Sequence, residues 1–195
     1  MEFDIESIII ALGYLGIFLM MTSNGAVSFP SSQILYIICG YFIFTGDLNV
    51  VLVVFFGALG NTIGCIILYE LVRQKGLKYI TKWNLFPKKE IKKIVVALRK
   101  KGLWFIFIGK LLPAIKVFVP IAAGVGKTRR ELFIPIMLIT SAIWTAPFLA
   151  IGFYFGKSSD VFGSYAIVLA IVAVFVIGLF YKFINSKEVL EEIED

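Results

Sequence analysis

Four long stretches of the chain carry no charged side chain. They are Ser7–Gly46, Leu48–Tyr69, Leu132–Gly156 and Val161–Tyr181, with 40, 22, 25 and 21 residues. A helix needs about 20 apolar residues to cross the hydrocarbon core of a bilayer. The pattern therefore predicts an all-α integral membrane protein.

The first uncharged stretch is interrupted. Residues Asn24–Gln33 include Gly25, Pro30 and several small polar side chains, which do not suit the interior of a helix. The apolar segment that follows, Ile34–Gly46, has only 13 residues. An outside-facing turn accounts for this, and so does a re-entrant hairpin over residues 7–46 whose irregular tip is buried in protein or lines a wet cavity.

A second interrupted region follows the middle of the chain. Two apolar pieces of 11 and 13 residues, Gly102–Leu112 and Ala114–Gly126, flank Pro113. Segments of this length are typical of re-entrant structure and too short to cross the bilayer. The pattern predicts a second re-entrant hairpin over residues 102–126.

The two interrupted regions match in the order of their residues. In each, a proline precedes a glycine, an acidic residue follows seven positions after the glycine, and an uncharged stretch comes next. The first set is Pro30, Gly40 and Asp47, and the second set is Pro113, Gly124 and Glu131. We interpret the prolines and glycines as structural residues of the two hairpins.

The order of segments also predicts their orientation. A hairpin returns to its own side, and a spanning helix at about 49–70 crosses the membrane, so the second hairpin enters from the other side. Spanning helices at 131–156 and 161–182 complete about three crossings in a single membrane domain, residues 1–195. Paired interrupted segments in an inverted repeat indicate a transporter with its site near the middle of the membrane.

Composition and charge predict which segments face the cytoplasm. Hydrophobic residues make up 59% of the chain and charged residues 16%, and 11 of the 19 Lys and Arg lie within residues 71–101. Short basic loops stay in the cytoplasm, so we expect this loop and the C-terminus on the cytoplasmic side of a multi-pass cell-membrane protein. Because the net charge of +6 comes from one juxtamembrane loop, nucleic acid is not an expected partner.

The basic loop also contains a helical pattern. Ile91, Ile94, Val95 and Leu98 recur at helical spacing among lysines. This predicts a basic amphipathic helix on an anionic membrane face.

Some chemistries are excluded. The chain has no histidine, and Cys39 and Cys65 lie in apolar surroundings. A zinc site, a haem site and a histidine-based triad are therefore not expected, and neither is a cofactor or an enzyme activity. The cysteines are interpreted as small packed hydrophobic residues, with a disulfide as the alternative.

Two lysines fall inside the second hairpin, Lys110 and Lys116. A lysine in the bilayer core costs roughly 2.5–3.5 kcal/mol on insertion scales, so each needs compensation. One interpretation is that both side chains extend to an interface along their aliphatic stems. The other is an anion site in which the two ammonium groups hold a phosphate.

A second polar group lies at the tip of the first hairpin and consists of Asn24, Ser31, Ser32 and Gln33. These side chains donate and accept hydrogen bonds without titrating. One interpretation is a capped turn, with Ser31 or Ser32 as the N-cap of a helix from Gln33. The other is a lining for the substrate path, since a helix N-terminus favours an anion.

Residues 108–124 resemble the hallmark of a known family. The stretch reads IGKLLPAIKVFVPIAAG, and it is similar to the pattern G-R-x-x-P-x-x-R-x-x-x-P-x-x-A-G of the DedA (VTT-domain, SNARE-associated Golgi protein) family of integral membrane proteins. Further matching positions are Pro30, Gly40, Tyr41, Gly60–Gly64, Tyr69, Arg73, Gly76, Glu131–Phe133, Trp144 and Gly152–Gly156.

The resemblance implies two opposed re-entrant hairpins with spanning helices, and work on membrane lipids. The hairpin arginines of the family fall on Lys110 and Lys116. Relatives carry carboxylates in the first hairpin, where this chain has Ser23-Asn24 and Gln33 or Ser32. Many relatives also have an acid after the glycine of the spanning helix, where this chain has Cys65. The loss of these acids favours scrambling without proton coupling.

Together these features predict a flippase-like or scramblase-like lipid translocase. Lys110 and Lys116 would bind the phosphate of an anionic lipid such as polyprenyl phosphate or a phospholipid, while the polar group of the first hairpin lines the path. The alternative is an ion-coupled or proton-coupled secondary transporter of a small solute. The sequence does not set the identity of the lipid, the direction of movement or the oligomeric state. It also leaves open whether transport is proton-coupled, with Asp47 or Glu131 in place of the missing carboxylates.

Overall fold

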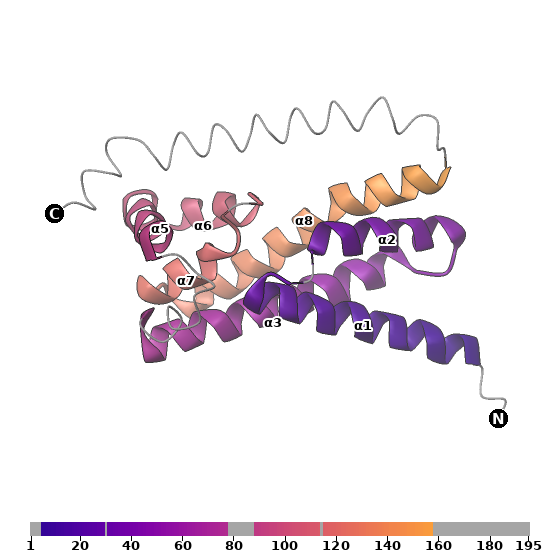
Figure 1. Ribbon diagram of the computed structural model, residues 1–195, viewed down its shortest axis with the longest axis horizontal. Helices are drawn as coiled ribbons and strands as arrows, with labels where there is room; N and C mark the ends of the chain where they lie inside the picture. Colours follow the sequence, from indigo (N-terminus) through magenta and orange to yellow (C-terminus); the bar gives the residue numbers. More distant parts are fainter. Residues whose placement is uncertain (1–4, 30, 78–87, 114, 158–195) are drawn as a thin grey trace. The chain divides into compact units, whose positions relative to one another are not determined.

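The computed structural model describes residues 5–29, 31–77, 88–113 and 115–157. All regular secondary structure in these residues is α-helical, which confirms the all-α expectation (Figure 1). The helices are α1 (Ile5–Val27), α2 (Ser32–Thr45), α3 (Val50–Lys75), α5 (Lys88–Lys101), α6 (Leu103–Lys110), α7 (Phe118–Val125) and α8 (Arg130–Lys157). Pro30, the expected spanning helix at 161–182 and the charged C-terminus lie outside the described residues.

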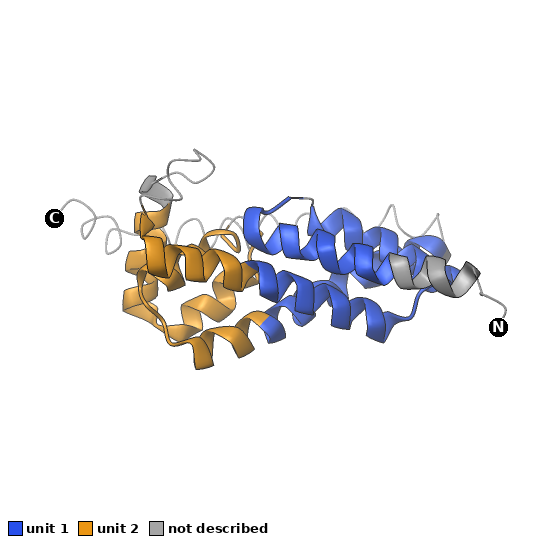
Figure 2. Ribbon diagram, turned by 90° about the horizontal axis from the view of Figure 1, so that it is seen from below, with its two compact units in different colours: residues 1–64, 138–165 blue, residues 65–137, 166–195 orange. Residues whose placement is uncertain are grey.

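The chain divides into two compact units (Figure 2). Unit 1 comprises residues 1–64 and 138–165, and unit 2 comprises residues 65–137 and 166–195. The division falls inside α3 and inside α8, so each of these long helices contributes one part to each unit.

Within the described part of the chain, two helices meet the length and hydropathy expected of a membrane span. They are Val50–Lys75 and Arg130–Gly156. These helices agree with two of the three spans that the uncharged stretches predict, at 49–70 and 131–156. Large apolar side chains on the helices are exposed, including Leu19, Val51, Phe55, Trp104 and Tyr154. Such a surface suits lipid, because soluble proteins rarely expose extended apolar patches.

The break between α1 and α2 is shorter than the sequence suggests. The expected irregular segment begins at Asn24, but α1 continues through Asn24 and Gly25 to Val27, and α2 begins at Ser32. Asparagine disfavours a helix because its side chain competes for backbone hydrogen bonds. Here the side-chain oxygen of Asn24 accepts a hydrogen bond from the Asn61 side chain instead, so the backbone helix is retained.

The break between α6 and α7 is longer than the sequence suggests. Each helix has only eight residues, about 12 Å of helix, so neither crosses a hydrocarbon core of about 30 Å. The sequence predicts that the two pieces meet at Pro113, but residues 111–113 and 115–117 form turns and a bend. The helix ends early because the position before a proline disfavours the α conformation.

Glycines allow close helix contacts in unit 1. A Cβ atom on Gly60 of α3 would lie 2.3 Å from the carbonyl oxygen of Phe18 in α1, and one on Gly64 would lie 2.0 Å from that of Thr22. A Cβ atom on Gly40 of α2, one of the two expected hairpin glycines, would lie 2.3 Å from the Leu149 carbonyl oxygen of α8. These approaches leave no room for a side chain at the three positions, as in small-residue contacts of membrane helices.

Unit 2 has its own apolar core, in which α5 packs against α6 and α7. Ile91, Ile94, Val95 and Leu98 of α5 are all buried in this core. The expectation that this stripe rests on lipid is therefore wrong, because protein covers it. A Cβ atom on Gly124 of α7, the other hairpin glycine, would lie 2.7 Å from the Tyr69 carbonyl oxygen, so this glycine also marks a close contact.

Candidate functional site

Lys110 is the last residue of α6 and is buried in unit 2, with 5% of its surface exposed. Its ammonium group donates a hydrogen bond to the Cys65 Sγ atom of α3 over 2.9 Å. Cys65 itself has no exposed surface. A cation therefore lies inside the unit, in contact with a sulfur atom.

Lys116 lies in the run of turns between α6 and α7 and is 9% exposed. The backbone of these turns is internally bonded: the Lys116 N–H donates to the Leu112 carbonyl oxygen over 2.9 Å, and the Phe118 N–H donates to that of Ile115 over 2.8 Å. Such pairing is required wherever irregular backbone is withdrawn from water. The turns thereby hold Lys116 in a buried, ordered segment.

The two lysines lie six positions apart in the chain, at the end of α6 and in the turns that follow it, and both belong to unit 2. Both side chains are buried within unit 2. The resulting pair of buried ammonium groups has the charge and donor capacity to hold an anion such as phosphate.

The polar residues expected at the first hairpin tip are split between two sets of contacts in unit 1. Asn24 is buried and accepts a hydrogen bond from Asn61 Nδ2 over 3.0 Å. Asn61 Oδ1 in turn accepts one from the Ser141 hydroxyl over 2.9 Å. These three side chains link α1, α3 and α8, and Asn61 has the interhelical role typical of a polar residue in an apolar helix.

Ser31, Ser32 and Gln33 form the other set. The Ser31 and Ser32 hydroxyls donate to the Gln33 side-chain oxygen over 3.0 and 3.3 Å, and Ser32 Oγ accepts from Trp144 Nε1 over 3.2 Å. Ser31 occupies the N-cap position of α2 without a capping hydrogen bond from its side chain. The predicted N-cap position is therefore found at Ser31, but its hydroxyl donates to Gln33 and accepts no backbone N–H of the first helical turn.

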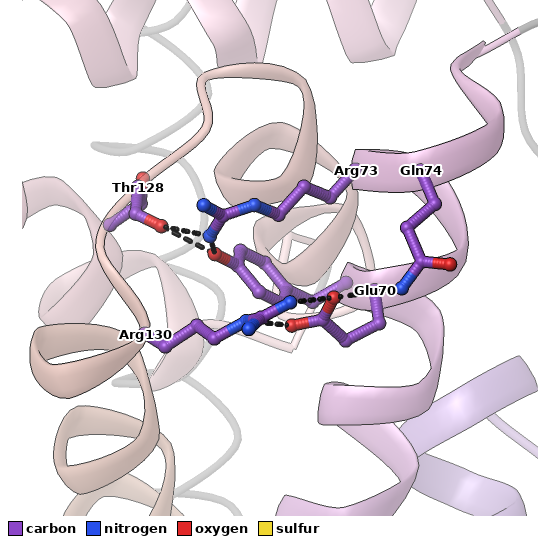
Figure 3. A network of polar contacts seen from close by, with 6 residues as sticks. Glu70, Arg73, Gln74, Thr128 and Arg130 are labelled. Atoms are coloured by element: carbon purple, nitrogen blue, oxygen red, sulfur yellow. Dashed lines mark hydrogen bonds and ion pairs between the residues drawn. The ribbon is translucent and has the colours of Figure 1, made fainter.

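A third polar network lies in unit 2, where α3 ends and α8 begins (Figure 3). Arg73 Nη1 donates to the Tyr69 hydroxyl and, over 3.2 Å, to the Thr128 carbonyl oxygen. The Tyr69 hydroxyl donates to the same carbonyl oxygen. Arg130 makes two hydrogen bonds to the Glu70 carboxylate, of 2.5 Å from Nε and 2.8 Å from Nη2. This network fixes the ends of two long helices.

The structure assigns contacts to residues that sequence patterns did not single out. Ser141 carries no signal of its own, because an isolated hydroxyl in an apolar helix has no characteristic spacing. Trp144 matches the family pattern, but that match does not indicate its contact with Ser32. Cys65 did carry a signal, since the family resemblance aligns it with an acidic position. Cys39 and Cys65 are both free thiols, so the disulfide alternative is wrong. Within the described ranges, His, Cys, Asp and Glu form no group of three or more that could hold a metal ion.

Comparisons with known proteins match most of the chain. A family model described as the VTT domain covers residues 5–154. An uncharacterised membrane protein of Bacillus subtilis (strain 168), YbfM, is 27% identical over 152 residues, which are 76% of this chain and 93% of that protein. No solved structure matches the chain.

Two further relatives carry a functional name. Undecaprenyl phosphate transporter A of Staphylococcus aureus (strain NCTC 8325 / PS 47) is 26% identical over 170 residues, 84% of this chain and 82% of the relative. The protein of the same name from Bacillus subtilis (strain 168) is 24% identical over 177 residues, 87% of each chain. Because the VTT model covers far more than half of the chain, this membrane protein belongs to the VTT-domain (DedA) family, whose hallmark residues 108–124 resemble.

Proposed function

We propose that this protein moves a phosphate-bearing lipid, such as polyprenyl phosphate or a phospholipid, across the bilayer of the cell membrane. Lys110 and Lys116 bind the lipid phosphate. Two relatives are named as transporters of undecaprenyl phosphate, a lipid of this class. The family and these names indicate a membrane transporter rather than an enzyme.

The observation that carries the proposal is the burial of both lysines in one unit of a membrane protein. Each ammonium group in an apolar surrounding costs roughly 2.5–3.5 kcal/mol on insertion scales. A bound phosphate offsets this cost through charge-assisted hydrogen bonds, which are stronger than neutral ones. Lysine binds phosphate as a point charge and tolerates several head-group orientations, which suits a site that must also release its lipid.

We further propose that α1–α2 and α6–α7 are re-entrant hairpins of an inverted repeat. The lengths of α6 and α7 support this for the second hairpin, because eight-residue helices cannot cross the bilayer. In the first hairpin the 14-residue α2 is likewise too short to cross, whereas α1, with 23 residues, is long enough. In unit 1 the proposed head-group contacts are Asn24, Ser31, Ser32 and Gln33. Ser31 is exposed and Gln33 is half-buried, so these two can rotate toward a ligand most readily.

Movement without proton coupling is part of the proposal. The described acidic side chains near the helix ends, Asp47, Glu70 and Glu131, are exposed or half-buried. The polar side chains buried in unit 1, including Asn24, Asn61 and Ser141, are amides and hydroxyls that do not titrate near neutral pH. These residues favour a passive scramblase over a pump.

The test uses purified protein in liposomes with a small fraction of fluorescent polyprenyl phosphate or phospholipid. An impermeant reductant bleaches the outer leaflet, and further bleaching reports the lipid that crosses. We expect faster loss of inner-leaflet fluorescence than in protein-free liposomes. If the inner leaflet stays protected for every head group, while the protein exchanges a small solute across the same membrane, the secondary-transporter alternative replaces this proposal.

A further inference from the structure

We propose that Cys65 sets the anion affinity of the two-lysine site, by serving as a weak partner of Lys110 that phosphate displaces. The inference rests on the proposed function, since it assumes that Lys110 and Lys116 receive a phosphate. It adds a specificity-determining residue from α3 to a site whose lysines come from α6 and the turns that follow.

The geometry places the sulfur at the ammonium group. Cys65 Sγ lies 2.9 Å from Lys110 Nζ, and the thiol side chain is fully enclosed by protein. Lys116 follows Lys110 by six positions and is buried in the same unit. A phosphate that contacts the two ammonium groups therefore approaches the same donor that the thiol contacts.

The chemistry of sulfur makes this contact replaceable. The sulfur of cysteine is a weak hydrogen-bond acceptor, whereas the oxygens of a phosphate form short, charge-assisted bonds with an ammonium group. A carboxylate at the same position would bind Lys110 as an ion pair and neutralise it. The Cys65 thiol thus orients the Lys110 ammonium group without neutralising its charge, so a lipid phosphate can still form an ion pair with it.

The matched variants are Cys65→Asp and Cys65→Asn, which have nearly the same shape and differ in charge. Full-length protein in detergent is titrated with undecaprenyl phosphate and with undecaprenol, its uncharged counterpart. We expect Cys65→Asp to bind undecaprenyl phosphate about tenfold more weakly than Cys65→Asn, because it forms an ion pair that phosphate must break. Binding of undecaprenol should be the same in both.

A smaller variant keeps the inference testable if Cys65→Asp does not fold. Cys65→Ala removes the acceptor and requires no extra space. Since phosphate must displace the thiol, we expect Cys65→Ala to bind undecaprenyl phosphate more tightly than the unmodified chain does, and equal binding would show that the thiol does not compete with phosphate. A loss of about tenfold would show that the thiol keeps acting on Lys110 in the bound state, and it would overturn the inference.

The outcomes separate this inference from the proposed function. If the unmodified protein does not prefer undecaprenyl phosphate over undecaprenol, the proposed phosphate site itself fails. If it does prefer the phosphate, and Lys110→Gln abolishes that preference while Cys65→Asp and Cys65→Asn bind equally, only the role of Cys65 fails.

Discussion

At the scale of single residues, Lys116 carries a conflict between stability and function. Its ammonium group is buried in an apolar unit, where a charge lowers the stability of the fold. In the proposed function the same charge binds the lipid phosphate. Residues of this kind destabilise the protein that they serve. Replacing them separates the two effects.

We predict that Lys116→Met retains or raises the midpoint of thermal unfolding and lowers lipid movement by about tenfold or more. Methionine has a similar length and removes the cost of burying the charge. Lys116→Arg keeps the charge and should keep most of the movement. Equal activity of Lys116→Met and the unmodified protein would exclude Lys116 from the site.

Asn61 tests the buried hydrogen bonds of unit 1. The substitution Asn61→Leu removes its bonds to Asn24 and Ser141 and leaves both groups without this partner. Hydrogen bonds between membrane helices contribute about 0.6 kcal/mol each on average, with a maximum near 1.7, so we expect a loss of about 1–3 kcal/mol. The control Ser141→Ala removes one of the two bonds and should cost less. Denaturation in mixed detergent micelles measures both values.

At the scale of helices, close packing depends on glycine at the contact between α1 and α3. We predict that Gly64→Ala destabilises the protein by about 1–3 kcal/mol, because its Cβ atom would lie 2.0 Å from the Thr22 carbonyl oxygen. Gly16→Ala is the matched control, since nothing lies within 4 Å of a Cβ atom there. That variant should be neutral or slightly stabilising in the same unfolding measurement. Similar losses at both positions would contradict the packing.

The ion pair between Glu70 and Arg130 joins the end of α3 to the start of α8. Both side chains are partly exposed, at 22% and 53%, so salt screens their attraction. A double-mutant cycle with Glu70→Gln and Arg130→Gln should give a small favourable coupling at low salt that fades at high salt. A coupling that persists in high salt would mean that this network is shielded from solvent.

The sequence predicted the helical elements better than their ends. The two spans were foreseen because uncharged apolar stretches of bilayer length are rare outside membrane helices. The end of α1 was not predicted correctly. Asn24 and Gly25 disfavour a helix locally, but tertiary contacts with Asn61 and Gly64 override that preference. The amphipathic stripe of α5 was foreseen, but its partner was not, because an apolar face does not specify whether lipid or protein covers it.

The sequence predicted the lysines of the candidate site but not their long-range partners. Two lysines in an apolar region are conspicuous in any sequence, and the structure places both of them in the interior of unit 2. The Cys65 contact spans 45 positions along the chain, a separation that periodicity cannot detect. The long-range hydrogen bonds of Ser141 with Asn61 and of Trp144 with Ser32 escape periodicity in the same way.

At the scale of the whole molecule, we predict that a proton gradient does not drive transport. Since the buried polar groups described in unit 1 are amides and hydroxyls, they offer no buried carboxylate to carry a proton. In proteoliposomes with fluorescent phospholipid, a transmembrane pH gradient should leave the final distribution of label between leaflets unchanged. Accumulation of label in one leaflet that a protonophore collapses would indicate proton coupling.

A phosphate path through the two lysines is tested most sharply by comparing charge variants in the same liposomes. The measurement is the rate at which fluorescent polyprenyl phosphate from the inner leaflet becomes accessible to the reductant. We predict that Lys110→Ala combined with Lys116→Ala reduces this rate to that of protein-free liposomes. Lys110→Arg combined with Lys116→Arg should retain it, as should Lys92→Ala on the exposed face of α5. An unchanged rate in the double alanine variant, with the protein folded, would contradict a phosphate path through these lysines.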